Sequence, residues 1–161
     1  MSIPREHRLR KHAEFEVVYR CGQRHFSQSL TAFYLLRAEL GSKGAEGFED
    51  SGRDTEYNRQ ARVGITVGRA MGKSVVRNRI KRRVRAAVAQ NLERLTRPLD
   101  LVINPKKAVL EIEFQQLCSE VARAFDVVEQ KARLGRDKSN VPLQRQKSGK
   151  SHRLSARKLS K

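Results

Sequence analysis

The sequence has few of the residue types that build metal sites, disulfide frameworks or membrane spans. Only two cysteines occur in the 161 residues, Cys21 and Cys118, and neither belongs to a CxxC pair. The four histidines lie in different segments, so we expect neither a zinc site nor a disulfide scaffold. The longest apolar stretches, residues 30–36 and 99–103, are far shorter than the roughly 20 residues of a membrane-spanning helix. We therefore expect no membrane partner and no metal or other cofactor bound by the protein alone.

The N-terminal residues are basic and lead directly into an amphipathic segment, without the apolar stretch and small-residue cleavage site of an export signal. Together with the scarcity of cysteine, this pattern favours a cytoplasmic location.

Acidic residues are also few, 17 against 35 lysines and arginines, which gives a formal net charge of +18. A positive charge of this size predicts an anionic partner, of which nucleic acid is the first candidate. The sequence contains no HExxH, HxxxH or GxSxG motif and no cluster of Asp and Glu, so we predict no catalytic residues and no active site in the protein itself.

The charges divide the chain into three parts. Residues 39–56 carry six acidic and two basic side chains, with four glycines and two serines, which indicates a mobile surface insertion at about 39–60. Residues 136–161 carry nine basic side chains and one acidic one, as in a tail that is disordered when unbound. With 38% hydrophobic residues, one core is expected. We predict a single RNA-binding domain over 1–134 and a basic tail over 135–161.

Hydrophobic periodicity predicts the order αβββαβα, and hence an α+β fold in which helices pack on a small mixed sheet as an α-β sandwich. Two strands, 30–37 and 61–68, are expected to pair with each other across the acidic insertion. The other predicted elements are helices at 10–20 and 111–132, strands at 24–27 and 99–104, and a helix within 69–97.

The stretch 69–97 is the most informative, with ten basic residues and one acidic residue. On a helix, one sector of about 120° collects an apolar stripe of Val76, Ile80, Val84, Ala87 and Val88. The remaining arc collects Asn78, Arg79, Lys81, Arg82, Arg83 and Arg85. A basic face is often only solvated, but like charges four residues apart repel one another, a cost that a bound anion removes. The pattern therefore favours nucleic-acid binding through arginine forks.

Residues 77–82, RNRIKR, follow Gly72, Val75 and the strand sequence VGITVG, and they resemble the RNR motif of the bacterial ribonuclease P protein component family. A second similarity is the N-terminal pattern of Arg8, Leu9, Phe15, Tyr19 and Gly22. The resemblance covers about residues 8–131, and Ala70 and Ser74 depart from the family pattern. It implies a left-handed βαβ crossover, although general chain physics favours the right hand.

The resemblance also implies a function: the protein joins a large catalytic RNA and helps to remove the 5′ leader from precursor tRNA. Catalysis then belongs to the RNA subunit, and Mg²⁺ is expected only through that RNA. The partners implied are the catalytic RNA and precursor tRNA, without DNA. The residues that the family motif assigns to contact with the catalytic RNA are Arg69, Arg77, Asn78, Arg79, Lys81, Arg82 and Arg85.

A cleft between the first helix and the sheet takes the single-stranded leader in this family, and its aromatic positions correspond to Phe15, Tyr19 and Phe33. Aromatic rings suit unpaired bases because they stack on them. The alternative is that Phe15 and Tyr19, four residues apart, form the core face of their helix. Tyr19 is favoured for the cleft because its hydroxyl prefers a wet edge. Strand alternation allows only one of Phe33 and Tyr34 on the cleft face, and the family pattern selects Phe33.

Two other classes of protein fit the composition. The first is a structural ribosomal protein, or another basic RNA-binding protein without a processing role. Only the RNR run and the N-terminal pattern distinguish the ribonuclease P assignment from this alternative. A two-fold symmetric DNA-binding protein fits poorly, since the sequence shows neither heptads nor a helix-turn-helix pair.

Overall fold

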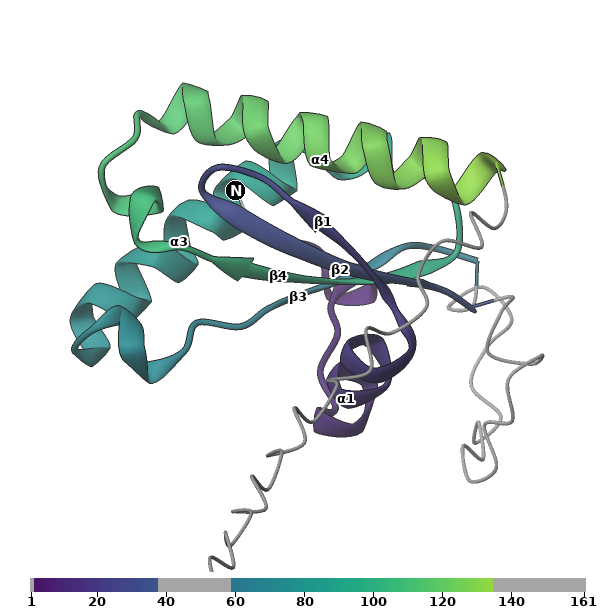
Figure 1. Ribbon diagram of the computed structural model, residues 1–161, viewed down its shortest axis with the longest axis horizontal. Coiled ribbons are helices and arrows are strands. Elements are labelled where there is room, and N and C mark those ends of the chain that lie inside the picture. The colour runs from purple at the N-terminus through teal and green to yellow at the C-terminus, as the bar shows by residue number, and fades with distance from the viewer. Residues whose placement is uncertain (1, 38–58, 135–161) are drawn as a thin grey trace, which may run out of the picture.

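The computed structural model describes residues 2–37 and 59–134, and the insertion predicted at 39–60 and the tail predicted at 135–161 lie almost wholly outside these ranges. Figure 1 shows the elements in space. Its helices and strands are α1 (His12–Cys21), β1 (Gln23–Phe26), β2 (Leu30–Leu36), β3 (Arg62–Ile65), α3 (Ser74–Asn91), β4 (Leu99–Pro105) and α4 (Phe114–Leu134). Short 3₁₀ turns lie at Arg5–His7, Arg69–Met71, Leu92–Arg94 and Lys107–Leu110. The predicted α+β class and the order αβββαβα are confirmed.

The four strands form one mixed sheet in the order β1-β2-β4-β3. Antiparallel pairing joins β1 to β2 and β2 to β4, whereas β3 and β4 are parallel. The prediction that strands 30–37 and 61–68 pair with each other is therefore wrong, because β4 lies between β2 and β3. The reason is burial: β4 is almost entirely buried, and a strand buried on both faces belongs in the middle of a sheet.

The helix α3 connects the parallel strands β3 and β4, so these three elements form a βαβ unit. The hand of this crossover stays a prediction. After Ile65 the chain leaves the ladder, although the Thr66 N–H still donates to the Ile103 carbonyl oxygen at 3.0 Å. The strand predicted over 61–68 is therefore shorter in the structure, and residues 66–68 lead directly toward the start of α3.

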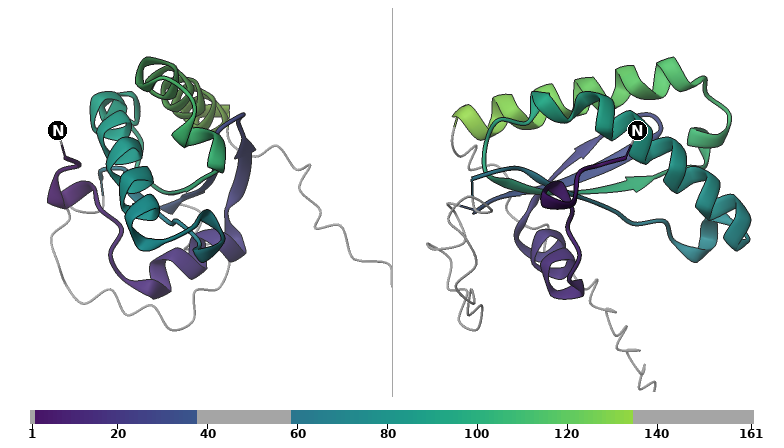
Figure 2. Two further views of the ribbon diagram at one scale, coloured as in Figure 1. Left: turned by 90° about the vertical axis from the view of Figure 1, so that its left-hand side faces the viewer. Right: turned by 180° about the vertical axis from the view of Figure 1, so that it is seen from behind.

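The sheet lies between two helical layers, with α3 and α4 on one face and α1 on the other (Figure 2). The larger core lies beneath α3 and α4, where the predicted stripe residues Ile80, Val84, Ala87 and Val88 are fully buried. In α4 the buried positions include Leu117, Val121, Phe125 and Val128. A smaller cluster of buried residues under α1 consists of Leu9, Val18, Leu35 and Val102. None of the helices in the described ranges is both long and apolar enough to cross a membrane.

An ion-pair network attaches α1 to the sheet. Arg62 of β3 binds Asp100 of β4 with both ends of its fork, Nε to Oδ1 at 2.9 Å and Nη2 to Oδ2 at 2.7 Å. The third nitrogen, Nη1, binds Glu14 Oε1 at 2.7 Å. The other oxygen of Glu14 accepts the backbone N–H groups of Arg10 and Lys11 at the start of α1. One arginine therefore fixes the N-terminal end of this helix over β3 and β4.

The pKa of Glu14 is lowered from 4.5 in the folded protein. Burial is the largest influence and opposes ionisation, but the Lys11 and Arg10 N–H groups and the Arg62 guanidinium together outweigh it. A lowered carboxyl pKa stabilises the folded state at pH values above the unfolded pKa. This stabilisation is lost as the pH falls through the folded value.

We predict that Glu14→Gln lowers the free energy of unfolding by about 1 to 2 kcal/mol at neutral pH, because charge-assisted hydrogen bonds to Arg62 and the helix start are weakened. The difference from the wild type should shrink as the pH falls below 4.5. Urea unfolding at a series of pH values measures this. Glu16→Gln is the matched control, since Glu16 is exposed and its one ion pair within residues 2–37 and 59–134 is with the exposed His12. Equal effects of the two substitutions at every pH would contradict the assignment.

Candidate nucleic-acid interface

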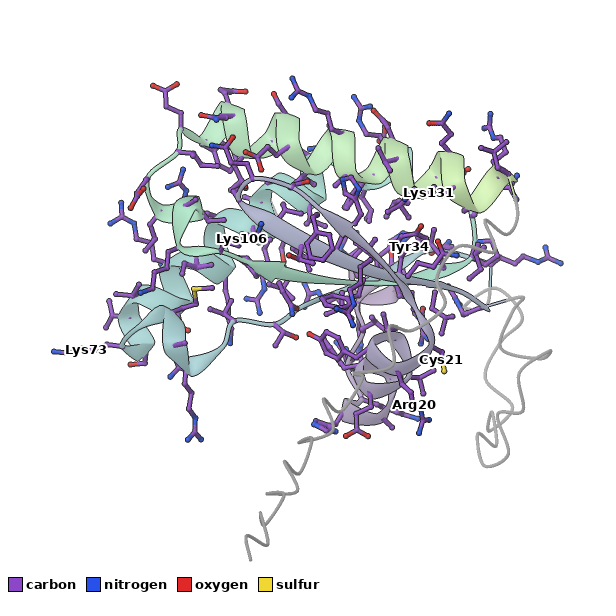
Figure 3. The ribbon with its side chains drawn as sticks, in the orientation of Figure 1. Arg20, Cys21, Tyr34, Lys73, Lys106 and Lys131 are labelled. Carbon is purple, nitrogen blue, oxygen red and sulfur yellow. The ribbon has the colours of Figure 1, made fainter. Side chains whose placement is uncertain are left out.

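The first turns of α3 carry the predicted basic face. Gly72, which ends the preceding 3₁₀ turn, has a φ of 120°, a left-handed conformation that a side chain disfavours. This turn allows the helix to start at Ser74, immediately after Lys73, which extends away from the protein in Figure 3. Five of the predicted contact residues are exposed, namely Arg69, Asn78, Arg79, Arg82 and Arg85. Arg77 and Lys81 are half-buried.

No ion pair joins any of the six basic residues among these seven to a carboxylate in residues 2–37 and 59–134. By contrast, Arg94 and Arg97, which follow α3, are each paired with an acidic residue of α4. The cationic side chains of the first turns therefore retain their full attraction for an anion. Arg77 also has a buried Nε with no hydrogen-bond partner among the residues that the structure describes, which is an unmet donor at the edge of this face.

Arg83 lies on the same arc but differs from its neighbours. Its guanidinium donates to two backbone carbonyl oxygens, those of Leu110 at 3.2 Å and Ile112 at 2.5 Å. These bonds tie α3 to the segment between β4 and α4. Arg83 is therefore a structural residue, whereas Arg79 and Arg82 project into solvent.

The second surface is the sheet face under α1. Tyr19 of α1 and Phe33 of β2 are both half-buried there, with ring centroids 4.8 Å apart in an edge-to-face arrangement. The guanidinium carbon of Arg24 lies 5.4 Å from the centre of the Phe33 ring. Tyr34 lies on the opposite face, 2% exposed, and its hydroxyl donates to Gln23 Oε1 (Figure 3). Strand alternation therefore places Phe33, and not Tyr34, on the α1 side.

Phe15 belongs to the same cluster but packs more tightly. A Cβ atom added to Gly64 of β3 would lie 2.5 Å from Cε1 and 2.6 Å from Cζ of the Phe15 ring. The ring thus rests directly on the backbone of β3, in a space that only glycine leaves open. Phe15 is half-buried, so it contributes both to the packing of α1 and to the wall of the surface beside it.

One polar residue on this face was not predicted from the sequence. Asn104, near the end of β4, accepts a 2.7 Å hydrogen bond from the Tyr19 hydroxyl through its Oδ1 atom. The two residues are 85 positions apart, and a single asparagine before a proline carries no pattern that predicts such a partner. The register pairs Asn104 with Thr31 of β2, which is also half-buried.

The two surfaces lie toward the same end of the sheet. β3 and β4 run in parallel and end near Ile65 and Ile103, and the antiparallel β2 begins opposite this end. The chain that leaves β3 here continues to Arg69 and the first turn of α3. The Tyr19–Asn104 contact lies at this end as well.

An α+β domain with an uncompensated basic helix beside an aromatic sheet face is a small nucleic-acid-binding protein. The Ribonuclease P family model matches residues 3–129. The chain belongs to this family, which confirms the resemblance drawn from the RNR run and the N-terminal pattern.

Individual relatives agree with the family match. The chain is 25% identical over 125 residues to a ribonuclease P protein component of Bacillus cereus, covering 78% of this chain and 90% of that one. One from Bacillus anthracis is 25% identical over 123 residues, covering 76% and 88%. The fold is similar to those of the RNase P proteins from Staphylococcus aureus (TM-score 0.57, 17% identity, covering 76% and 95%) and Thermotoga maritima (TM-score 0.56, 21% identity, covering 74% and 96%).

We predict that Gly64→Ala destabilises the protein by about 1 to 3 kcal/mol, because the new methyl group overlaps the Phe15 ring. In a Phe15→Ala background the same substitution should cost clearly less, since the two nearest atoms are gone and the next, Leu9 Cβ, is 3.2 Å away. Thermal unfolding of the two single variants and the double variant measures the coupling. Additive losses would show that the ring does not rest on Gly64.

Proposed function

We propose that this chain is the protein component of a ribonuclease P, which binds a catalytic RNA and the 5′ leader of precursor tRNA and assists removal of that leader. The observation that carries the proposal is the exposed basic face of α3, which has no acidic partner in the described part of the chain and carries the RNR run of the family. Under this proposal the protein acts in the cytoplasm, as part of an endoribonuclease in which the RNA subunit carries out catalysis.

The basic face of α3 is assigned to the catalytic RNA. Arginine forks can each hold two phosphate oxygens, and Asn78 adds an amide that reaches a phosphate or a base edge. The buried stripe of α3 holds the helix on the sheet before RNA arrives, so these side chains start from a fixed backbone. Binding then removes the mutual repulsion of like charges such as Lys81 and Arg85, four residues apart on the helix.

The sheet face under α1 is assigned to the leader. Single-stranded RNA is bound by aromatic rings that stack on its bases and by cations that neutralise its phosphates. Phe15, Tyr19 and Phe33 offer such rings, and Arg24 lies against one of them. The edge-to-face contact of Tyr19 and Phe33 holds both rings in place, so little side-chain freedom is lost when a base binds.

The chemistry is assigned to the RNA subunit, with Mg²⁺ bound through that RNA. The protein supplies positive charge and a surface for the leader. A reconstituted enzyme tests this division: the protein alone should leave precursor tRNA uncut, and its addition to a ribonuclease P RNA at low magnesium should restore cleavage. Cleavage by the purified protein without RNA would refute it.

We predict that Arg79→Ala and Arg82→Ala each weaken assembly with the catalytic RNA about tenfold, through loss of a charge-assisted phosphate contact. Each should also reduce the slope of log K against log salt concentration by about 1, since fewer counterions are released. Filter binding at several salt concentrations measures both quantities. Arg94→Ala is the matched control, because Arg94 is exposed but already paired with Asp126, and it should change neither. An unchanged salt slope in both test variants would mean that the face is only solvated.

We predict that Tyr19→Ala weakens binding of precursor tRNA to the reconstituted enzyme by about 1 to 3 kcal/mol, the value of one base stacked on an aromatic ring. Mature tRNA has no leader, so its affinity should barely change. The comparison is made below the melting temperature of the variant, because truncation also leaves a cavity beside Phe33. Equal losses for the two RNAs, or no loss for either, would contradict the leader assignment.

A further inference from the structure

The hydrogen bond between Tyr19 and Asn104 places an amide group on the part of the sheet that α1 leaves uncovered. Asn104 is half-buried at the end of β4, and its Oδ1 atom accepts the tyrosine hydroxyl at 2.7 Å. Thr31, opposite Asn104 in the register, and Phe26, opposite Thr31 on β1, extend the same face. Phe26 is 67% exposed. The amide is therefore flanked by accessible side chains at an open end of the sheet.

The bond leaves the other end of the amide available. Nδ2 of Asn104 carries two N–H donors, and no acceptor for them lies among residues 2–37 and 59–134. With the Tyr19 hydroxyl on Oδ1, the amide is held in one orientation, with its donors directed away from that contact. A half-buried donor pair without a protein acceptor suits a ligand that brings its own acceptor atoms.

The Asn104 amide lies at the rim of the Tyr19 ring. Because the Tyr19 hydroxyl is at the rim of its ring and contacts Asn104 directly, the amide begins where the stacking surface ends. A base stacked on Tyr19 or Phe33 extends beyond the ring that supports it. Its edge, which carries carbonyl oxygens and ring nitrogens as acceptors, then reaches the Nδ2 donors.

We propose that Asn104 reads the identity of one leader base by donating from Nδ2 to an acceptor on the edge of that base, with Tyr19 as the residue that positions the amide. This inference rests on the proposed function, since it requires the leader to bind the α1 face. It gives Tyr19 two separable roles, because the ring stacks on a base and the hydroxyl orients Asn104. The leader preference then depends on a residue that belongs neither to the RNR run nor to the aromatic residues Phe15, Tyr19 and Phe33.

The experiment uses the reconstituted enzyme and precursor tRNAs in which each leader position carries A, C, G or U in turn. The quantity compared is the ratio of dissociation constants between the worst and the best base at one position, which cancels any general change in RNA affinity. One hydrogen bond corresponds to a ratio of about threefold to tenfold. We expect such a ratio at one position for the wild type, and a ratio close to one for Asn104→Ala.

Two further variants isolate the donor and its orientation. Asn104→Asp keeps an oxygen for the Tyr19 hydroxyl but has no donor, so the preferred base should change or the ratio should vanish. Tyr19→Phe removes only the positioning bond, so the ratio should fall while precursor tRNA is still bound more tightly than mature tRNA. Tyr34→Phe is the matched control: it removes a tyrosine hydroxyl bonded to Gln23 on the other face, and the ratio should stay at the wild-type value.

The measurements distinguish a failure of the proposed function from a failure of the proposal for Asn104. If Tyr19→Ala leaves precursor tRNA affinity unchanged, the leader does not bind this face and the proposed function loses its second surface. If Tyr19→Ala weakens that affinity but the same base preference persists in Asn104→Ala and Asn104→Asp, the leader binds here and Asn104 does not read it. A wild-type ratio near one at every position also overturns the inference.

Discussion

The buried carboxylate of Asp100, 4% exposed, determines the arrangement of the elements around it. An ionised carboxylate removed from water is costly unless it is paired and hydrogen-bonded. Asp100 meets this requirement with the Arg62 fork from β3 and with Arg37, which directly follows β2 and whose Nε lies 3.3 Å away. Arg62 also binds Glu14. The contacts that neutralise Asp100 therefore bring together the end of β2, the strands β3 and β4, and the start of α1. The parallel register of β3 on β4, which pairs Arg62 with Asp100, follows from the same contact.

This anchoring of α1 decides which part of the sheet stays open. With its first turn fixed at the Arg62–Asp100 end and Val18 buried on Leu35 and Val102, α1 covers one half of its sheet face. The other half, with Phe33 and Asn104, remains accessible at the end where the chain enters α3.

Local patterns in the sequence predicted what depends on local geometry. The buried positions of α3 and the order of elements follow from the helical and strand repeats, and both are confirmed. Strand alternation allowed only one of Phe33 and Tyr34 on the α1 face, and the family resemblance selected Phe33, which the structure places there. The position of β4 between β2 and β3 was missed because periodicity does not encode which strand pairs with which. The strand sequence LDLVIN is a nearly continuous apolar run, which is typical of a central strand and indicated the position of β4. Arg79 and Arg83 lie on the same predicted basic arc of α3, and the sequence does not distinguish them. Only the contacts of Arg83 with two carbonyl groups in a distant segment do so. The roles of individual residues toward RNA stay predictions.

Under the proposed function, RNA affinity and leader sequence preference have separate physical origins in this protein. Phosphate contacts by α3 are nearly independent of RNA sequence and fall with salt, because they act through charge and counterion release. Contacts on the sheet act on bases: stacking tolerates any base, whereas an oriented amide distinguishes the atoms on a base edge. The ion-pair network that positions α1 lies on the far side of Tyr19 from the open face. Changes of the amide at Asn104 can therefore alter the leader preference without disturbing either the anchoring of α1 or the charge of α3.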